Sequence, residues 1–203
     1  IFRGKYVSFD KFLSAAESGM GFCDVLFGWD VNDDLYDREN LTGWQTGFPD
    51  ACAKIDLTTF RTIPWEPDAA MFIMDLYDQN GEPYPLSPRH VLQKLVKRAN
   101  DLGYYPRLAA EYEYFLFEET SHSIREKDYR DLKPLSPGMF GYSVVRASTY
   151  SDLVHQIIDS MAEYDVELEG IHTETGPGVY ETAIRYDNGV RAGDKAALFK
   201  TGI

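Results

Sequence analysis

The chain has 203 residues, of which 44% are hydrophobic and 26% are charged, and its formal net charge is −13. This composition is typical of a globular protein that buries its own core. The negative charge excludes nucleic acid and anionic membrane surfaces as favoured partners, because both repel an acidic protein. No apolar run approaches the roughly 20 residues of a membrane span, so we expect no membrane association.

The two cysteines, Cys23 and Cys52, lack the C-x-x-C spacing of redox and zinc sites. No signal peptide is recognisable at the start of the chain. Both features indicate free thiols in a reducing compartment, and we therefore expect a cytoplasmic protein. The glycosylation sequon Asn40-Leu41-Thr42 is then coincidental.

Residues 1–86 alternate short strand-like runs with turn residues, which predicts a small α+β domain with one mostly antiparallel sheet. A single helix is expected at 9–18, with its apolar side facing the sheet. The strongest strand signal is followed at once by a polar turn with glycine. The expected strands are 1–7, 23–29 and 69–77, and the turn is 78–82.

The Pro-rich stretch 83–88 marks the boundary to a second predicted domain, residues 87–203. Ser87 as N-cap and Pro88 at the first helical position begin a helix that ends at Gly103. Its predicted buried stripe contains Val91, Leu92, Leu95, Val96, Ala99 and Leu102. The other expected elements are strand 107–118, a polar loop at 119–139, a helix at 151–164, and strands 166–174 and 179–186 around a Gly-Pro-Gly turn.

Two short acidic segments carry most of the functional information. The first, residues 109–117, places Glu111 and Glu113 two apart in an apolar run, and alternate side chains of a strand share a face. The second, residues 169–181, has carboxylates on both sides of the turn. Two bare carboxylates about 4 Å apart repel by roughly 4 kcal/mol at an effective dielectric near 20. Inward-facing acids at this density predict a hard divalent cation.

The first acidic segment resembles the glutamate strand of the glutamine synthetase family, G-x-E-x-E-F-F-L-F. The second is similar to that family's V-E-x-x-H-H-E-x-x-P-G-Q-x-E segment. Further likeness occurs at residues 3–6, 62–67 and 81–84, so the resemblance covers nearly the whole chain in the family's order. It implies a small β-grasp domain, followed by the first part of a catalytic half-barrel of antiparallel strands with helices.

The same resemblance implies an ATP-dependent ligase. The γ-carboxylate of glutamate would be phosphorylated by ATP, and ammonia or a primary amine would then displace phosphate to leave a γ-glutamyl amide. Two or three Mg²⁺ or Mn²⁺ ions would hold the phosphates and screen their charge. Members of the family form homo-oligomeric rings in which the small domain of one subunit completes its neighbour's site, and we expect the same of the full-length protein.

Carried over residue by residue, the resemblance assigns metal binding to four glutamates. Glu113, Glu174 and Glu181 match the ligands of the cation beside the glutamate substrate. Glu111 matches a ligand of the cation that bridges the ATP phosphates. His172 borders Glu174 and is interpreted either as a phosphate contact or as a structural histidine.

Nucleotide contacts are implied at two further positions. Glu169 matches a nucleotide-contacting glutamate, and Tyr186 matches an aromatic residue that lies against the adenine. Glu181 and Tyr186 differ in strand parity, so a regular strand would place them on opposite faces. We therefore expect a bulge or strong curvature in this part of the sheet.

Departures from the family pattern leave alternatives open. No D-G-S-S latch precedes Trp44, which weakens the case for ammonia as the nucleophile; Asp50 is the nearest acidic candidate. The chain begins without Met, and residues 195–203 resemble a helix cut short, so we expect an N-terminal piece that is inactive alone. The rival interpretations are a non-catalytic structural or assembly relative and a two-carboxylate glycosidase, for which the chain lacks an aromatic platform near the glutamates.

Overall fold

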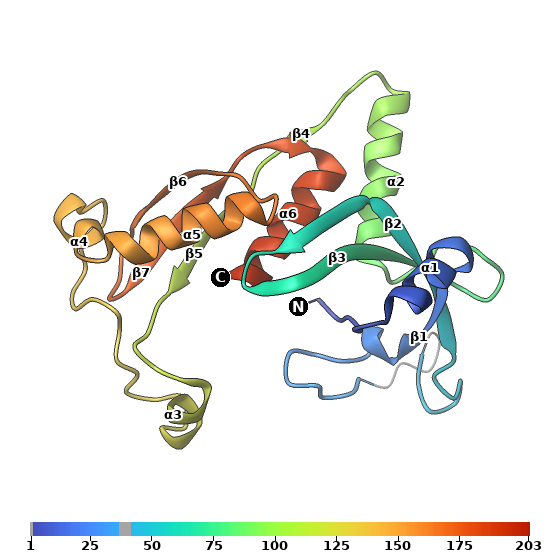
Figure 1. Cartoon of the computed structure of the whole chain (residues 1–203), viewed down its shortest axis with the longest axis horizontal. Coiled ribbons are helices and arrows are strands. Elements are labelled where there is room, and N and C mark those ends of the chain that lie inside the picture. The colour runs from blue at the N-terminus through green and yellow to red at the C-terminus, as the bar shows by residue number, and fades with distance from the viewer. Residues whose placement is uncertain (1, 37–41) are drawn as a thin grey trace.

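The N-terminal part of the protein is a three-stranded antiparallel sheet that carries one helix. The computed structural model describes residues 2–36 and 42–203, so the sequon falls mostly outside the described residues. The strand order is β1-β2-β3, and β2 and β3 form a long hairpin (Figure 1). The bounds are β1 (Met20–Cys23), β2 (Asp50–Ile63), β3 (Glu66–Tyr77) and, for the helix, α1 (Phe9–Ser18).

Helix α1 begins at Ser8, whose side-chain oxygen accepts a hydrogen bond from the Lys11 amide. Its buried residue Ala15 packs against Met20 of β1 and Ala53 of β2. The helix therefore covers one face of the first sheet, because small residues let its backbone approach the strands closely.

A second, smaller set of elements joins this sheet to the rest of the molecule. It comprises α2 (Pro88–Asp101), β4 (Arg107–Leu108), β8 (Asp187–Asn188) and α6 (Gly189–Gly202). Helices α2 and α6 pack together behind the hairpin (Figure 1). Arg89 of α2 binds Asp56 of β2, Asp75 of β3 and Asp194 of α6 at 2.7, 2.7 and 2.9 Å. Such charge-assisted bonds tie the hairpin to both helices.

The second three-stranded sheet is also antiparallel and has the order β5-β7-β6. Helix α5 lies along it (Figure 1). The bounds are β5 (Glu111–Phe115), α5 (Ser151–Glu163), β6 (Leu168–Thr173) and β7 (Val179–Ile184). Both sheets share one main core, whose buried members are Ile73, Met161, Tyr164, Val166, Ile184, Leu198 and Phe199.

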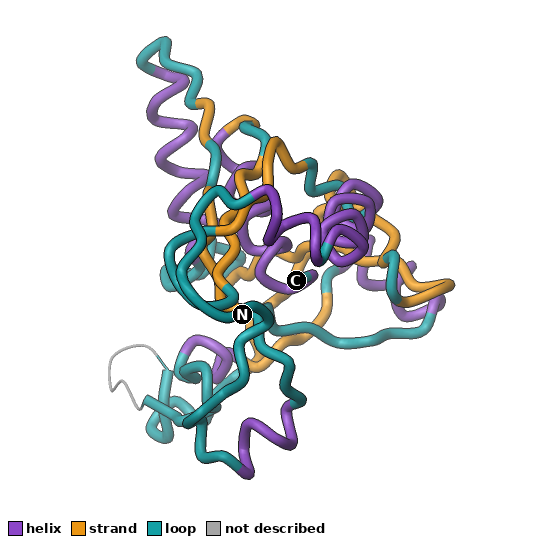
Figure 2. The backbone as a smooth tube through the Cα atoms, turned by 90° about the vertical axis from the view of Figure 1, so that its left-hand side faces the viewer, coloured by secondary structure: helices purple, strands orange, loops and turns teal. Residues whose placement is uncertain are grey.

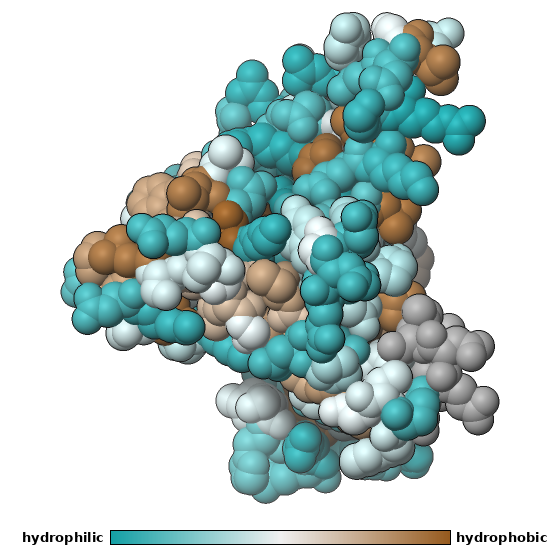
Figure 3. All heavy atoms as spheres, turned by 90° about the vertical axis from the view of Figure 1, so that its right-hand side faces the viewer, coloured by the Kyte–Doolittle hydropathy of each residue, from teal (hydrophilic) through white to brown (hydrophobic). Residues whose placement is uncertain are grey.

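Three short elements lie outside these layers, in parts of the chain that are rich in loops (Figure 2). They are the 3₁₀ helix η1 (Asp24–Phe27), α3 (Ser121–Glu126) and α4 (Val144–Thr149). On the side that carries α1 and α2, exposed apolar residues form separate patches among polar ones (Figure 3). None of the helices within the described residues has both the length and the apolar character needed to cross a bilayer.

Most predicted elements are confirmed. Helix 9–18 matches α1, helix 151–164 matches α5, and the strands on either side of the Gly-Pro-Gly turn match β6 and β7. The predicted strand 69–77 forms the greater part of β3. Cys23 and Cys52 are free thiols, as expected. Mixed helices and antiparallel sheets agree with the predicted α+β class.

Two predicted strands near the N-terminus are wrong. Described residues 2–7 form no strand; instead the side chains of Arg3 and Lys5 bind the carbonyls of Asp30 and Gly21, each at 3.0 Å. Within 23–29 the chain turns into η1, because the buried Asp24 carboxylate accepts hydrogen bonds from Thr42 and Tyr84 at 2.8 Å. Strand propensity alone does not make a strand where tertiary contacts hold the backbone differently.

Three predictions in the second predicted domain need correction as well. The expected strand 107–118 is divided into β4 and β5, because the first part pairs with β8 and the second with β7. The expected loop at 119–139 contains α3. In α2, the predicted stripe is incomplete: Leu92, Val96 and Ala99 are half-buried, whereas Val91, Leu95 and Leu102 are exposed.

Candidate metal centre

One face of the sheet β5-β7-β6 carries a row of ionisable side chains. Glu113 of β5 lies directly opposite Glu181 of β7, and Glu181 lies directly opposite His172 of β6. Directly opposite residues on neighbouring strands point to the same face. Glu111, two residues before Glu113, shares that face and lies opposite Ala183. The prediction that both glutamates of this strand share a face is confirmed.

The register that makes this row is set by the other face of the sheet. Tyr112 and Tyr114 alternate with the glutamates and pack against Phe199, with ring centroids 5.3 and 5.9 Å away. The Tyr114 hydroxyl hydrogen bonds to Thr182 of β7 at 2.8 Å, and the Tyr112 hydroxyl donates to the Ala196 carbonyl at 3.0 Å. A slip of one residue would move these rings out of the core, so the apolar face fixes where the acids point.

Three members of the site converge: His172, Glu174 and Glu181 each offer one ligand atom, and these atoms lie within 4.8 Å of one another. The His172 Nε2 atom lies 3.7 Å from Glu181 Oε2, and Nδ1 lies 3.9 Å from Glu174 Oε2. Their side chains are 32%, 15% and 18% exposed, in the order His172, Glu174, Glu181. The cluster is therefore sheltered but remains open to small solutes on one side.

Glu174 shows the clearest sign of a binding function. Its Oε1 accepts a hydrogen bond from the Thr175 hydroxyl, whereas its Oε2 is buried and has no hydrogen-bond partner among the described residues. Hydrogen bonds from the Thr175 side chain and backbone, together with nearby His172, lower the pKa of Glu174. The group is thus held as a carboxylate, and a buried carboxylate oxygen without a partner is costly. Two carboxylates and an imidazole form a donor set that suits a divalent cation.

The four predicted metal ligands do not all lie in the cluster. Glu174 and Glu181 come together in the cluster, Glu113 stands beside Glu181 in register, and Glu111 is one position further along the same face. Both residues of β5 are exposed and lie outside the group of three. His172 is the member that sequence reasoning did not count as a ligand. Only the pairing of β6 with β7 brings it opposite Glu181, although its spacing of two from Glu174 was a usable signal.

The predicted nucleotide contacts lie near the other end of these strands. Both Glu169 and Tyr186 are exposed and lie close to the Arg185 guanidinium. The expected irregularity exists, but it lies in β6: Leu168 pairs with Ile184 and Gly170 with Ala183, so Glu169 is the extra residue of a bulge. Tyr186 follows the end of β7, and strand parity does not constrain it.

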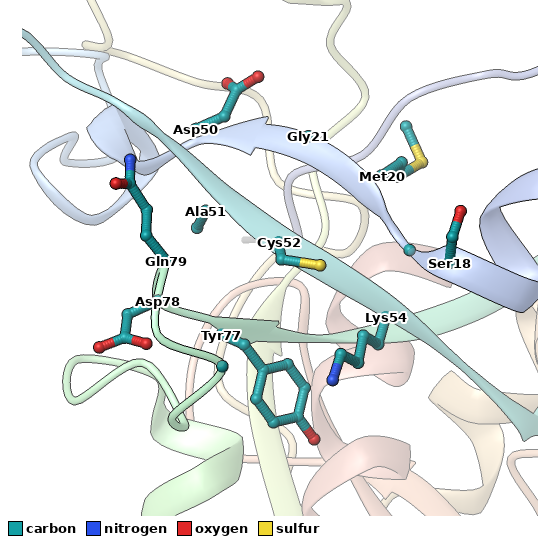
Figure 4. A pocket seen from close by; sticks show the side chains of 12 residues that line it. Ser18, Met20, Gly21, Asp50, Ala51, Cys52, Lys54, Tyr77, Asp78 and Gln79 are labelled. Carbon is teal, nitrogen blue, oxygen red and sulfur yellow. The ribbon is translucent and has the colours of Figure 1, made fainter.

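A separate hollow lies on the first sheet. A groove of about 510 Å³ covers the outer face of β1, β2 and β3 (Figure 4). There the Lys54 ammonium lies 4.3 Å from the centroid of the Tyr77 ring, and Cys52 stands between β1 and β3. The groove is shallow and contains none of the predicted site residues. We therefore locate the candidate site by its donor atoms rather than by the size of the hollow.

Comparison with known proteins finds relatives of one family. Residues 85–203 match the family described as glutamine synthetase, catalytic domain. The chain is 46% identical to type-1 glutamine synthetase 2 of Dictyostelium discoideum, over 98% of this chain and 38% of that protein. It is 37% identical to glutamate–isopropylamine ligase of a Pseudomonas species, over 100% of this chain and 44% of that protein.

Solved structures show the same architecture. A structure titled "GmaS/ADP complex" superposes with a TM-score of 0.76 at 19% identity, covering 98% of this chain and 42% of that one. A structure titled "novel glutamine synthase homolog" gives 0.75 at 21% identity, covering 98% and 44%. The fold and the site define a mixed α/β protein with a carboxylate-rich candidate metal centre on an antiparallel sheet. The chain belongs to the glutamine synthetase family, and spans about two fifths of the length of these relatives.

Proposed function

We propose that the protein is an ATP-dependent ligase that joins the γ-carboxylate of glutamate to ammonia or a primary amine. The observation that carries this proposal is the buried, unpartnered Oε2 of Glu174 beside His172 and Glu181. A solvated acidic surface would not hold a carboxylate in this way, because water would satisfy both oxygens. The donor set is what a metal-dependent phosphoryl transfer requires.

The relatives agree on the class of reaction and differ in the amine. Their names describe a glutamine synthetase, a glutamate–isopropylamine ligase and, at 30% identity, a γ-glutamylethanolamide synthetase of Streptomyces coelicolor. All three names denote γ-glutamyl amide formation. The proposal therefore fixes glutamate as the acyl donor and leaves ammonia and small primary amines to be compared directly.

In this proposal Glu113, Glu174 and Glu181 hold the Mg²⁺ or Mn²⁺ ion beside glutamate, and Glu111 holds the ion between the ATP phosphates. The bound ions would neutralise the charge on the transferring phosphoryl group. The residues of the chain orient the donor atoms: Thr175 holds one oxygen of Glu174, which leaves the other directed into the cluster.

We further propose that Glu169 and Tyr186 contact ATP. Glu169 is the bulge residue of β6 and Tyr186 follows β7, so both lie at the end of the sheet opposite the turn. Glu169 is released from the regular pairing of β6, and Tyr186 is 56% exposed, so both side chains are accessible to a nucleotide.

The remaining proposals concern organisation. Residues 1–86 would form a β-grasp-like domain and 87–203 the first part of the catalytic half-barrel, which the family match from residue 85 supports. The full-length protein would be a cytoplasmic homo-oligomeric ring. The 203-residue chain alone would be inactive, because it spans about two fifths of its relatives.

The test is phosphate release by the full-length protein with ATP, glutamate and Mg²⁺ or Mn²⁺, in the presence of ammonia, isopropylamine or ethanolamine. We expect release that depends on both glutamate and one of these amines, with a γ-glutamyl amide of matching mass. Glu181→Gln should abolish release, and Glu163→Gln, an exposed glutamate of α5, should not. A wild-type protein that folds and binds no nucleotide or metal would instead support the structural, non-catalytic relative.

A further inference from the structure

The candidate metal centre is bordered by a segment, residues 140–143, that three hydrogen bonds tie to Thr173 at the end of β6. The Thr173 hydroxyl donates to the Phe140 carbonyl at 2.7 Å and accepts from the Ser143 amide at 2.9 Å. The Thr173 carbonyl accepts from the Tyr142 amide at 2.7 Å. Thr173 is 4% exposed, so these bonds are shielded from water and each is costly to lose.

The 140–143 segment is held in a conformation that it would rarely adopt without these bonds. Tyr142 has a φ angle of 56°, in the left-handed region that bulky residues avoid. Its ring stacks on the His172 imidazole at 4.4 Å, with 23° between the planes. A Cβ atom at Gly141 would lie 3.9 Å from Oε2 of Glu174. The segment thus stacks on His172 and passes close to Glu174.

The carbonyl of Thr173 also determines which nitrogen of the His172 imidazole carries the proton. It lies 3.1 Å from Nδ1 of His172, and because a carbonyl can only accept, this hydrogen bond requires the proton on Nδ1. In the neutral ring, Nε2 is then the atom with a free lone pair, and it faces Glu181 Oε2 at 3.7 Å. Metal-binding histidines use a hydrogen bond at the remote nitrogen in this way to fix their tautomer and orientation.

We propose that Thr173 is a positioning residue of the candidate metal centre. Its hydroxyl holds the 140–143 segment in place, so that Tyr142 covers His172, and its carbonyl keeps the imidazole with Nε2 directed at Glu181. Thr173 itself touches neither ion nor substrate. The inference rests on the proposed function in that Glu174 and Glu181 hold a divalent cation, and it adds their neighbour His172 as a further donor.

The test compares Thr173→Val, which keeps the side-chain shape and removes the hydroxyl, with Thr173→Ser, which keeps the hydroxyl, in the full-length protein. In Thr173→Val we expect amide exchange at Tyr142 and Ser143 to rise at least tenfold relative to β7. The ¹⁵N signals of the His172 ring should shift, because the Tyr142 ring would no longer be held against the imidazole. Mn²⁺ affinity should fall about tenfold, as for other residues that orient a ligand. Thr173→Ser should keep the amide exchange, the imidazole signals and the Mn²⁺ affinity of the wild-type protein.

Unchanged exchange and an unchanged imidazole spectrum in folded Thr173→Val protein would overturn the proposal. Should that variant fail to fold, Tyr142 offers a second test because it is 72% exposed. Tyr142→Ala should alter the imidazole spectrum. Tyr142→Phe retains the stacked ring and should preserve that spectrum. The same spectrum in both variants would overturn the proposal. A wild-type protein that binds no Mn²⁺ would refute the metal centre, whereas exchange and imidazole signals would still decide the role of Thr173.

Discussion

The two three-stranded antiparallel sheets of this protein have the same number of strands and differ in what their open faces carry. In the first sheet, the central row across the strands is Gly21, Cys52 and Tyr77. In the second, the corresponding row is Glu113, Glu181 and His172. Like charges placed directly opposite each other destabilise a sheet. The second sheet retains this unfavourable pair of like charges, which is expected where the carboxylates serve to bind a ligand.

The packing of its opposite face offsets this charge repulsion in the second sheet. Tyr112, Tyr114 and Phe199 form a buried aromatic layer there, whereas α1 meets the first sheet through the small residues Ala15 and Ala53. A rigid apolar layer keeps the register of the strands and so keeps the acids together. The candidate metal centre therefore depends on a layer of aromatic side chains that includes none of its own residues.

The largest expected effect tests this dependence. Phe199→Ala should lower the free energy of unfolding by about 3–5 kcal/mol, because a fully buried aromatic ring is replaced by a cavity. Urea unfolding measures it, with Phe9→Ala as the matched control, since Phe9 is 71% exposed. Equal losses in the two variants would show that the aromatic layer does not support the second sheet.

The next prediction concerns Glu174, a member of the candidate metal cluster. Glu174→Gln keeps the size of the side chain and removes the charge, and we expect it to weaken Mn²⁺ binding by at least ~10–100-fold, the range seen even for residues that only support ligands. Titration of Mn²⁺ in the full-length protein measures this. Glu163→Gln on α5 serves as control, and Glu174→Gln with wild-type affinity would contradict the assignment of the cluster.

A smaller effect of opposite sign is expected from the neighbour of the cluster on β5. Without divalent cations, Glu113→Gln should raise the free energy of unfolding by about 0.2–1 kcal/mol, because it removes a like charge opposite Glu181. Added Mn²⁺ should reverse the order of stability of the two proteins. Thermal unfolding with and without chelator gives the answer, and a loss of stability under both conditions would refute the charge conflict.

The smallest expected effect is local and depends on pH. Hydrogen bonds from Lys127, Ser123 and the Lys133 amide lower the pKa of Glu119 from 4.5 to about 2. A depressed folded-state pKa means that this stabilisation is present above about pH 4.5 and is lost as the pH falls toward about 2. Amide exchange in residues 119–133 should rise over that interval, more than in β7. Glu119→Gln should remove the dependence, and a profile unchanged by this substitution would contradict it.

Local signals in the sequence predicted much of the fold. Ser87 and Pro88 mark a helix start, alternation in residues 111–115 predicts a two-faced strand, and Gly176-Pro177-Gly178 predicts the turn between β6 and β7. These features depend on contacts between residues close in the chain, and such contacts are visible in sequence spacing. The first acidic segment likewise predicted that Glu111 and Glu113 share one face of the second sheet.

Other features depended on partners distant in the chain. The break between β4 and β5 follows from pairing with strands about 70 residues later, and the loss of a strand at 23–29 follows from bonds of Asp24 to Thr42 and Tyr84. The exposed half of the α2 stripe was missed because helical spacing shows which residues share a face and not which of them are covered.

The sequence by itself determined which residues of this protein are charged, which alternate, and which family pattern they follow, because these properties lie within short stretches of chain. Only the tertiary structure decided that His172 joins Glu174 and Glu181, and that Thr173 holds the 140–143 segment over the imidazole. Both depend on the register of β6 against β7 and on a loop 30 residues away. Register is set by the packed core as a whole, which no single segment encodes.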